Sequence, residues 1–157
     1  MAHKGEKFYI GTTRFTNSSY IEREKWRDKH EWKGCIYGVT KRISPIIPPQ
    51  SLIYVLEMNN DTNKIEGIGL IRNYVNSNYR VCIYKSDTNY NRFIYNSNRH
   101  ITRKDIPFPN SLILLENIVF KGSGHYKRGQ GITTISWDRF NISTITILKA
   151  FFQKIFR

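Results

Sequence analysis

The sequence predicts an α+β domain, a small, mainly-β, partly open barrel with peripheral helices and a C-terminal helix. Short apolar runs separated by turn residues recur along the chain, as in β-rich folds. A charged segment near the N-terminus and an amphipathic segment at the C-terminus have helical character. The 157 residues suffice for one domain with a real core, so we expect a single domain over 1–157. Its barrel and a basic loop should span 8–135, and its terminal helix 143–157.

The N-terminal part predicts two strands with a helix between them. Residues 7–12 (KFYIGT) form a short apolar run that ends at a glycine, which is typical of a strand. Capping residues at 17–19 precede a charged segment at 21–30, which favours a short helix. Residues 34–40 (GCIYGVT) predict a second strand, and the prolines within 44–50 predict an irregular connection.

A β-hairpin is the clearest local prediction. Residues 52–58 (LIYVLEM) and 64–71 (KIEGIGLI) are β-rich, and the polar residues between them are typical of a turn. Gly67 and Gly69 in the second strand predict either a bulge or a backbone that a partner approaches closely.

The β pattern continues beyond the hairpin and then gives way to other structure. Residues 79–85 (YRVCIYK) and 91–96 (NRFIYN) predict two further strands joined by a polar turn. The prolines within 104–109 interrupt regular structure. The apolar run at 111–120 fits a helix or a strand, because short apolar runs are ambiguous.

The last part of the chain predicts an extended segment at 132–137 and an amphipathic helix capped by Ser143 or Thr144. The apolar residues of this helix share one face: Ile145, Leu148, Phe151, Phe152, Ile155 and Phe156. We expect this face to pack in the core. Docking on a protein partner or an acidic membrane is the alternative.

The chain carries a large and uneven positive charge. Its formal net charge is +13, with 25 Lys/Arg and 12 Asp/Glu. Residues 1–66 hold 11 basic and 8 acidic residues, whereas residues 67–157 hold 14 and 4. This asymmetry indicates an anionic partner, usually a nucleic acid. A basic surface that serves only solubility is the less favoured interpretation.

Residues 121–131 (KGSGHYKRGQG), called the basic loop below, combine four glycines with three cations. No acidic residue occurs between Glu116 and Asp138 to neutralise them. Flexible backbone N–H groups and positive charge suit a phosphate backbone. The expected phosphate-binding residues are Lys121, Lys127, Arg128 and Arg92.

No catalytic or metal-binding motif is recognisable. The four histidines are scattered, and the basic loop lacks the Lys-Ser/Thr pair of a nucleotide P-loop. Residues 9–13 (YIGTT) match half of a GIY-YIG nuclease motif but lack its preceding strand. His125 has no recognisable acid–base partner, and nothing in the sequence pairs Glu57, Glu66 or Asp105. We therefore expect a protein that is not an enzyme and uses no metal or cofactor.

Cys35 and Cys82 lie far apart and outside any C-x-x-C pattern, and no hydrophobic signal segment opens the chain. These features predict buried thiols in a reducing, intracellular compartment, cytoplasm or nucleus. No apolar run approaches the roughly 20 residues that a transmembrane helix needs.

Tyrosines and cations are interleaved in the β-rich half of the chain. They are Tyr74, Tyr79, Tyr84, Tyr90 and Tyr95 with Arg72, Arg80, Lys85, Arg92 and Arg99. Aromatic faces stack on unpaired bases and cations hold phosphates, so this pattern is expected for single-stranded nucleic acid. For any one of these tyrosines, packing on a barrel wall is the alternative.

The order of these features resembles the YTH domain and, more loosely, EVE and other PUA-like domains, over about residues 8–135. The similar segments are FYIGTT (8–13), GCIYGVT (34–40), IYVLEMNNDTNKIEGIGLI (53–71), NRFIYN (91–96), TRKDIPFPNSLILLENI (102–118) and HYKRGQGITTI (125–135).

The resemblance implies a non-catalytic module that binds a modified or flipped-out base in an aromatic pocket. By position it implies Tyr37 and Tyr90 as pocket walls and Tyr84 as a looser third wall. It implies Arg128 as the backbone clamp, helped by Lys127. The YTH cage is largely tryptophan, whereas tyrosine occupies the similar places here, which favours a general PUA-like pocket over an N6-methyladenine reader.

The prediction is therefore a nucleic-acid-binding module that holds single-stranded RNA or a flipped, modified or unmodified base. The alternative is a basic structural or packaging protein that binds nucleic acid without recognising a base.

Overall fold

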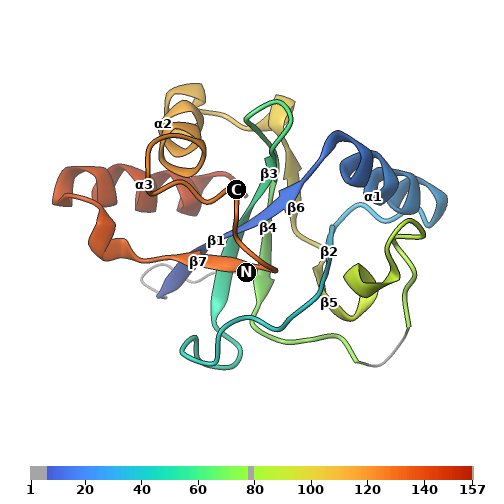
Figure 1. The fold of residues 1–157 in the computed structure, drawn as a ribbon. Helices are drawn as coiled ribbons and strands as arrows, with labels where there is room; N and C mark the ends of the chain where they lie inside the picture. Colours follow the sequence, from blue (N-terminus) through green and yellow to red (C-terminus); the bar gives the residue numbers. More distant parts are fainter. Residues whose placement is uncertain (1–6, 78–79, 157) are drawn as a thin grey trace.

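A five-stranded sheet with the order β6-β4-β3-β1-β7 forms the centre of the fold (Figure 1). The computed structural model describes residues 7–77 and 80–156. The strands of this sheet are β1 (Phe8–Phe15), β3 (Leu52–Asn59), β4 (Lys64–Arg72), β6 (His100–Thr102) and β7 (Thr133–Ile135). A second sheet pairs β2 (Cys35–Val39) with β5 (Phe93–Ser97) in antiparallel orientation and is called the β2–β5 ribbon below.

The helices are divided between the two sides of the five-stranded sheet (Figure 1). Helices α2 (Pro109–Phe120) and α3 (Ile142–Lys154) lie on one side, and α1 (Asn17–Lys29) lies with the β2–β5 ribbon on the other. Three short 3-10 turns are η1 (Thr88–Asn91), η2 (Arg103–Asp105) and η3 (Trp137–Arg139).

Strand β3 is buried along its whole length and divides the interior into two cores. Its alternating side chains point to opposite faces of the sheet, as in any strand. The helix-side core receives Leu52, Tyr54, Leu56 and Met58. The ribbon-side core receives Ile53 and Val55.

Strands β1 and β3 are parallel neighbours, paired from Phe8 with Leu52 to Phe15 with Asn59. Their carboxyl ends therefore lie at the same edge of the sheet. Helix α1 begins directly beyond β1, where Thr16 and Ser19 form a capping box. This edge, with the first turn of α1, borders the cavity described below.

The α+β class and most of the predicted elements are confirmed. The hairpin at 52–71 is β3 and β4, and the first strand extends to Phe15. The ambiguous run at 111–120 is helix α2, which begins at Pro109, a residue suited to the first turn of a helix. The described strands do not close into a barrel.

The predicted strand at 79–85 is wrong, although Tyr79 itself lies outside the described residues. Residues 80–84 form no regular element. The backbone N–H groups of Ile83 and Tyr84 both donate to the Asn91 Oδ1 atom at 2.9 Å. A side chain thus satisfies the groups that a partner strand would otherwise bind.

The predicted C-terminal helix is present, with Asn141 rather than Ser143 or Thr144 as its cap. Its expected apolar face contributes Leu148, Phe151, Phe152 and Ile155 to the helix-side core. Most of that face is therefore packed within the molecule, as expected. Within residues 7–77 and 80–156, no helix is long and apolar enough to span a membrane.

Candidate functional site

A cavity of about 390 Å³ opens where the carboxyl end of β1 approaches β2. It is lined by the end of β1 and the first turn of α1, by β2, by the β3–β4 turn, by residues 84–90 and by the end of the basic loop. The walls of the cavity thus come from segments that are far apart in the sequence.

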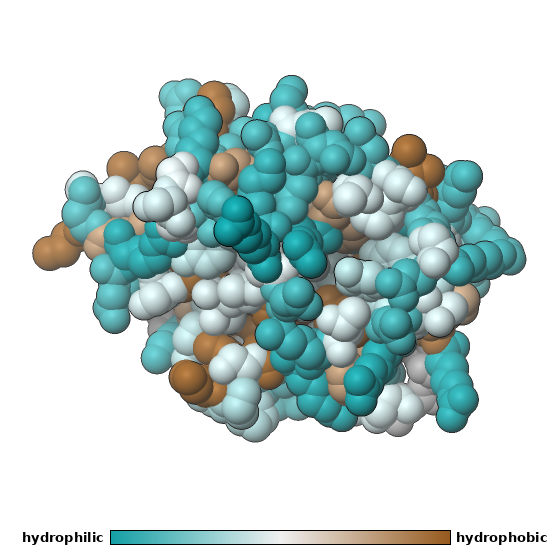
Figure 2. Space-filling model, in the orientation of Figure 1, coloured by the Kyte–Doolittle hydropathy of each residue, from teal (hydrophilic) through white to brown (hydrophobic). Residues whose placement is uncertain are grey.

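Figure 2 shows one face of the molecule, which is mainly hydrophilic with hydrophobic residues in small separate groups.

All three tyrosines predicted for a base pocket line this cavity. Their exposed fractions differ widely: 1% for Tyr37, 5% for Tyr84 and 40% for Tyr90. The rings of Tyr84 and Tyr90 meet edge to face, with centroids 6.1 Å apart and an interplanar angle of 70°. The tyrosines thus form a buried floor and one exposed wall, not a set of parallel plates.

Gly38 in β2 allows the tyrosine-bearing segment to lie against the ribbon. A Cβ atom at this position would lie 2.3 Å from the Tyr90 carbonyl oxygen and 3.4 Å from the Tyr84 ring. Any larger residue would displace backbone as well as side chain.

Hydrogen bonds from outside the sheets hold the segment that carries Tyr84. Asn91 Nδ2 donates to the Tyr84 carbonyl oxygen at 2.7 Å. The Glu22 carboxylate accepts from the backbone N–H of Lys85 at 2.6 Å and from the Ser86 hydroxyl at 2.7 Å. The Ser86 hydrogen bond lowers the pKa of Glu22 from its usual value. Tyr84 is thereby fixed without belonging to a strand.

The opposite side of the cavity is polar, with Arg14, Thr16, Ser19 and Asn60 among its lining residues. Arg14 Nη1 and Asn60 Nδ2 both donate to the Lys127 carbonyl oxygen, at 3.4 and 2.9 Å. These bonds attach the basic loop to the rim. Asn60 Oδ1 is buried and has no hydrogen-bond partner within the described part of the chain. Such an acceptor would be satisfied by a donor from water or from a ligand.

None of the predicted phosphate-binding residues lines the cavity. Lys127 Nζ donates to Asn63 Oδ1 at 2.7 Å, and the Arg128 side chain is exposed. Lys121 lies at the far end of the basic loop, where it caps the C-terminus of α2. Arg92 lies at the start of β5, with its guanidinium 5.2 Å from the Phe93 ring centroid. Gln130, at the other end of the loop, does reach the cavity.

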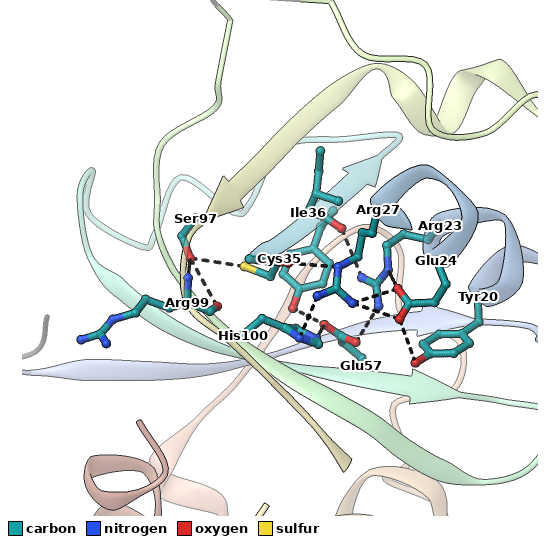
Figure 3. A network of polar contacts seen from close by, with 12 residues as sticks. Tyr20, Arg23, Glu24, Arg27, Cys35, Ile36, Glu57, Ser97, Arg99 and His100 are labelled. Carbon is teal, nitrogen blue, oxygen red and sulfur yellow. Dashed lines mark hydrogen bonds and ion pairs between the residues drawn. The ribbon is translucent and has the colours of Figure 1, made fainter. Parts of the chain in front are cut away.

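A buried polar network, which the sequence did not predict, lies beneath the cavity floor (Figure 3). At its centre Glu57 accepts from Arg23 Nη2 at 2.7 Å and from the Tyr37 hydroxyl at 2.6 Å. His100 Nε2 lies 2.9 Å from the same carboxylate. Arg23 also donates to the Ile36 carbonyl oxygen at 3.2 Å, which joins α1 to the ribbon.

Electrostatics keep Glu57 ionised and Tyr37 neutral. Burial alone would raise the pKa of Glu57, but Arg23 and His100 hold it well below its usual range. Burial and the neighbouring Glu57 carboxylate raise the pKa of Tyr37 well above its usual value. The Tyr37 hydroxyl is therefore committed to the interior, and only its ring can serve the cavity.

The two glycines of β4 make room for this network. A Cβ atom at Gly69 would lie 2.2 Å from the Tyr37 hydroxyl, and one at Gly67 would lie 3.0 Å from Glu57 Oε1. The pairing of β3 with β4 also shifts register between Glu57 and Met58. The predicted bulge is confirmed, whereas the groups that approach these glycines closely belong to the chain itself and not to a partner. The buried network could have been predicted from one signal, the single glutamate, Glu57, in an apolar strand that pairs with a strand containing Gly67 and Gly69.

The other candidate acids and thiols do not assemble into a site. Glu66 accepts from Asn59, and Asp105 from Thr102, so neither joins Glu57. Among the described residues no group of three or more His, Cys, Asp or Glu side chains could hold a metal ion.

The two thiols differ in their surroundings. Cys35 is buried, and burial raises the pKa of its thiol to about 11. Cys82 is exposed, so the prediction that both thiols are buried is wrong for Cys82. In the segment that carries Cys82, which lies outside both sheets, Ile83 and Tyr84 take the buried positions.

Comparison of the chain with known protein families, with curated proteins and with solved structures found no match.

Proposed function

We propose that this chain is a nucleic-acid-binding module that holds single-stranded RNA and accommodates one base, flipped or modified, in the cavity. The observation that carries this proposal is the convergence of Tyr37, Tyr84 and Tyr90 on one cavity that the basic loop also borders. Base-stacking rings beside a cationic loop are what a single strand requires.

The size and chemistry of the cavity support a base-sized ligand. Its volume of about 390 Å³ lies within the range of roughly 300–1,000 Å³ that is usual for small-ligand pockets. A flat base can stack on the exposed Tyr90 ring with its edge toward Tyr84. The unpaired Asn60 Oδ1 offers an acceptor for a donor on the ligand, direct or through water.

The phosphate backbone is assigned to the cations around the rim. Arg128 is exposed next to Lys127, whose carbonyl oxygen is already bound to the rim through Arg14. Arginine suits phosphate because its planar guanidinium can donate two parallel hydrogen bonds. Lys121 and Arg92 are proposed to supply further phosphate contacts.

We also propose that the sheet and the β2–β5 ribbon together form the partly open barrel of a PUA-like, YTH/EVE-like domain. The support is positional: the cavity lies between β2 and residues 84–90, where the resemblance places its aromatic walls. Such a module binds a base without transforming it. The free thiol of Cys82 fits a reducing intracellular compartment.

The test is a binding panel of RNA and DNA oligonucleotides, with methylated and unmethylated bases, at two salt concentrations. If several phosphates are neutralised, log K should fall with log salt by about 0.7 per phosphate contact for a single strand. Absence of binding to every oligonucleotide at low salt, or binding that salt does not weaken, would refute the proposal.

Two variants separate base recognition from charge attraction. Tyr90→Ala removes the exposed ring and should weaken binding about five- to a hundredfold, whereas Tyr90→Phe keeps the ring and should bind like the wild type. A packaging protein that does not recognise a base would bind all strands equally and would be insensitive to Tyr90→Ala.

A further inference from the structure

A second hollow of about 500 Å³, more open than the cavity, lies beyond the end of β2. Segments 42–49 and 73–77 and the buried Tyr95 line it. Most of its surface is apolar or aromatic: Ile43, Pro45, Ile47, Pro49, Tyr74 and Val75. Tyr74 is 52% exposed, so its ring is available to a ligand.

The hollow and the cavity are neighbours along one piece of chain. Thr40 lines the cavity and Arg42 lines the hollow, with only Lys41 between them. Two residues of extended chain span at most about 7 Å. The two depressions therefore have lining residues within about 7 Å of each other along the chain.

Three cations, Lys41, Arg42 and Arg92, are exposed here, with Lys41 directly after the cavity residue Thr40 and Arg42 in the lining of the hollow, and they are called the cation ridge below. The guanidinium groups of Arg42 and Arg92 lie 4.9 and 5.2 Å from the Phe93 ring centroid. Both guanidinium groups thus lie against the same aromatic ring, and each can donate to an anion.

Nothing in the adjoining sequence neutralises this ridge. No acidic residue occurs between Glu31 and Glu57 or between Glu66 and Asp87, and the two segments that line the hollow belong to these stretches. Asp87 lines the cavity instead, and its carboxylate accepts from the backbone N–H of Asn89 at 3.1 Å. An anion on the ridge is therefore favoured by charge.

The walls of the hollow are held in place without a ligand. Asn73 Nδ2 donates to the Ile47 carbonyl oxygen at 2.9 Å, and the Gln50 N–H donates to the Asn73 carbonyl oxygen at 3.1 Å. The Tyr95 hydroxyl accepts from the Ile43 N–H at 3.0 Å. Preformed walls reduce the ordering cost of binding.

We propose that the hollow holds the base of the next nucleotide of the same single strand, stacked on Tyr74, while the connecting phosphate lies on the cation ridge. The inference rests on the proposed function, because it extends the strand from the base in the cavity. A strand needs aromatic contacts for its bases and cationic contacts for its phosphates in alternation, and the cavity, the ridge and the hollow supply aromatic, cationic and aromatic contacts in that order.

The experiment uses the full chain and a fluorescently labelled single-stranded RNA of eight nucleotides, with anisotropy measured at several salt concentrations. Tyr74→Ala should weaken binding about five- to a hundredfold, and Tyr74→Phe should restore it, because stacking requires only the ring. Arg42→Ala should reduce the slope of log K against log salt by about 0.7, the loss of one phosphate contact. Circular dichroism checks that each variant is folded.

Lys104→Ala is the matched control, since it removes one exposed positive charge that lines neither depression. If Tyr74→Ala binds like the wild type while Tyr90→Ala is impaired, the inference is overturned and the proposed function stands. If Lys104→Ala lowers the salt slope as much as Arg42→Ala does, the ridge has no particular role and the inference also fails. If the wild type binds no strand, the proposed function fails and the inference falls with it.

Discussion

Tyr37 belongs to two systems at once. Its ring lines the cavity, and its hydroxyl donates to Glu57 in the buried network. Glu57 in turn holds the guanidinium of Arg23, whose exposed fraction is 0%. Buried charges are stable only when they are paired, so the position of the Tyr37 ring depends on a carboxylate that is itself fully buried.

Replacing Glu57 by glutamine should be strongly destabilising. Glu57→Gln keeps the shape of the side chain but removes the buried carboxylate that pairs with Arg23 Nη2, so that Glu24 alone pairs with this guanidinium, which should lower the free energy of unfolding by about 3–5 kcal/mol. Urea unfolding followed by circular dichroism measures this change. The control is Glu31→Gln, the same substitution at an exposed position, which should stay within about 0.5 kcal/mol of the wild type. A loss below about 1 kcal/mol for Glu57→Gln would contradict the pairing.

The buried thiol and phenol predict a loss of stability at alkaline pH. The folded-state pKa of Cys35 is raised from 9.0 to about 11, and that of Tyr37 is raised above 10.0. Each of these groups is neutral when protonated, so its raised folded-state pKa leaves the free energy of unfolding unchanged below the unfolded-state pKa. The free energy of unfolding then falls as the pH rises from the unfolded-state pKa to the folded-state pKa. The free energy of unfolding should thus decline above about pH 9, by at most about 1.4 kcal/mol per pH unit for each group.

Urea unfolding at a series of pH values between about 8 and 11 tests this expectation. Cys35→Ala removes the group that titrates first in the unfolded chain, so its stability should stay level until tyrosine ionisation begins near pH 10. A wild-type stability that is unchanged up to pH 11 would contradict the burial of these groups.

Elements whose partners lie close in sequence were predictable, and those with remote partners were less so. The β3–β4 hairpin carries its own turn, so pattern and turn chemistry agreed. The sequence of residues 79–85 had an equally clear β pattern, but backbone N–H groups of this segment donate to the side chains of Asn91 and Glu22. Periodicity shows which residues could form a strand, and it does not show which group satisfies their backbone.

The fit between β2 and the tyrosine-bearing segment predicts a specific effect of Gly38→Ala. The added methyl group would lie 2.3 Å from the backbone oxygen of Tyr90, so the segment must move, at an expected cost of about 1–3 kcal/mol in unfolding free energy. Urea unfolding gives the cost, and the NMR shifts of the Tyr90 ring report the displacement. Gly124→Ala is the control, because its methyl group would meet only the flexible end of Arg139. Equal stability of the two variants would contradict the close packing.

At the scale of the whole molecule, the cavity is a product of the topology. The sequence singled out Tyr37, Tyr84 and Tyr90 by their order in the chain, and the structure brings all three to one cavity. The sequence did not predict that Arg14 and Asn60 line the same cavity. They meet there because the parallel pairing of β1 with β3 places the ends of these strands together. That pairing joins remote segments and leaves no local pattern to read.

The two cores share a single sheet, which should make unfolding cooperative. Strand β3 supplies side chains to both cores, so neither core can lose its packing while the other keeps an intact sheet. The tryptophans report on the two sides separately. Trp137 packs against the helix-side core, whereas Trp26 and Trp32 pack against the ribbon-side core.

Two variants isolate these reporters: Trp137→Phe keeps the ribbon-side tryptophans, and the double variant Trp26→Phe, Trp32→Phe keeps Trp137. In each variant, fluorescence and circular dichroism should give the same urea midpoint, because a two-state domain shows coincident transitions by all probes. Comparison within a variant removes the effect of the substitutions on stability, including the lost hydrogen bond from Trp137 to the Phe8 carbonyl oxygen. If the Trp137 signal changes at a lower urea concentration than the circular dichroism, α2 and α3 detach before the sheet unfolds, and β3 does not couple the two cores.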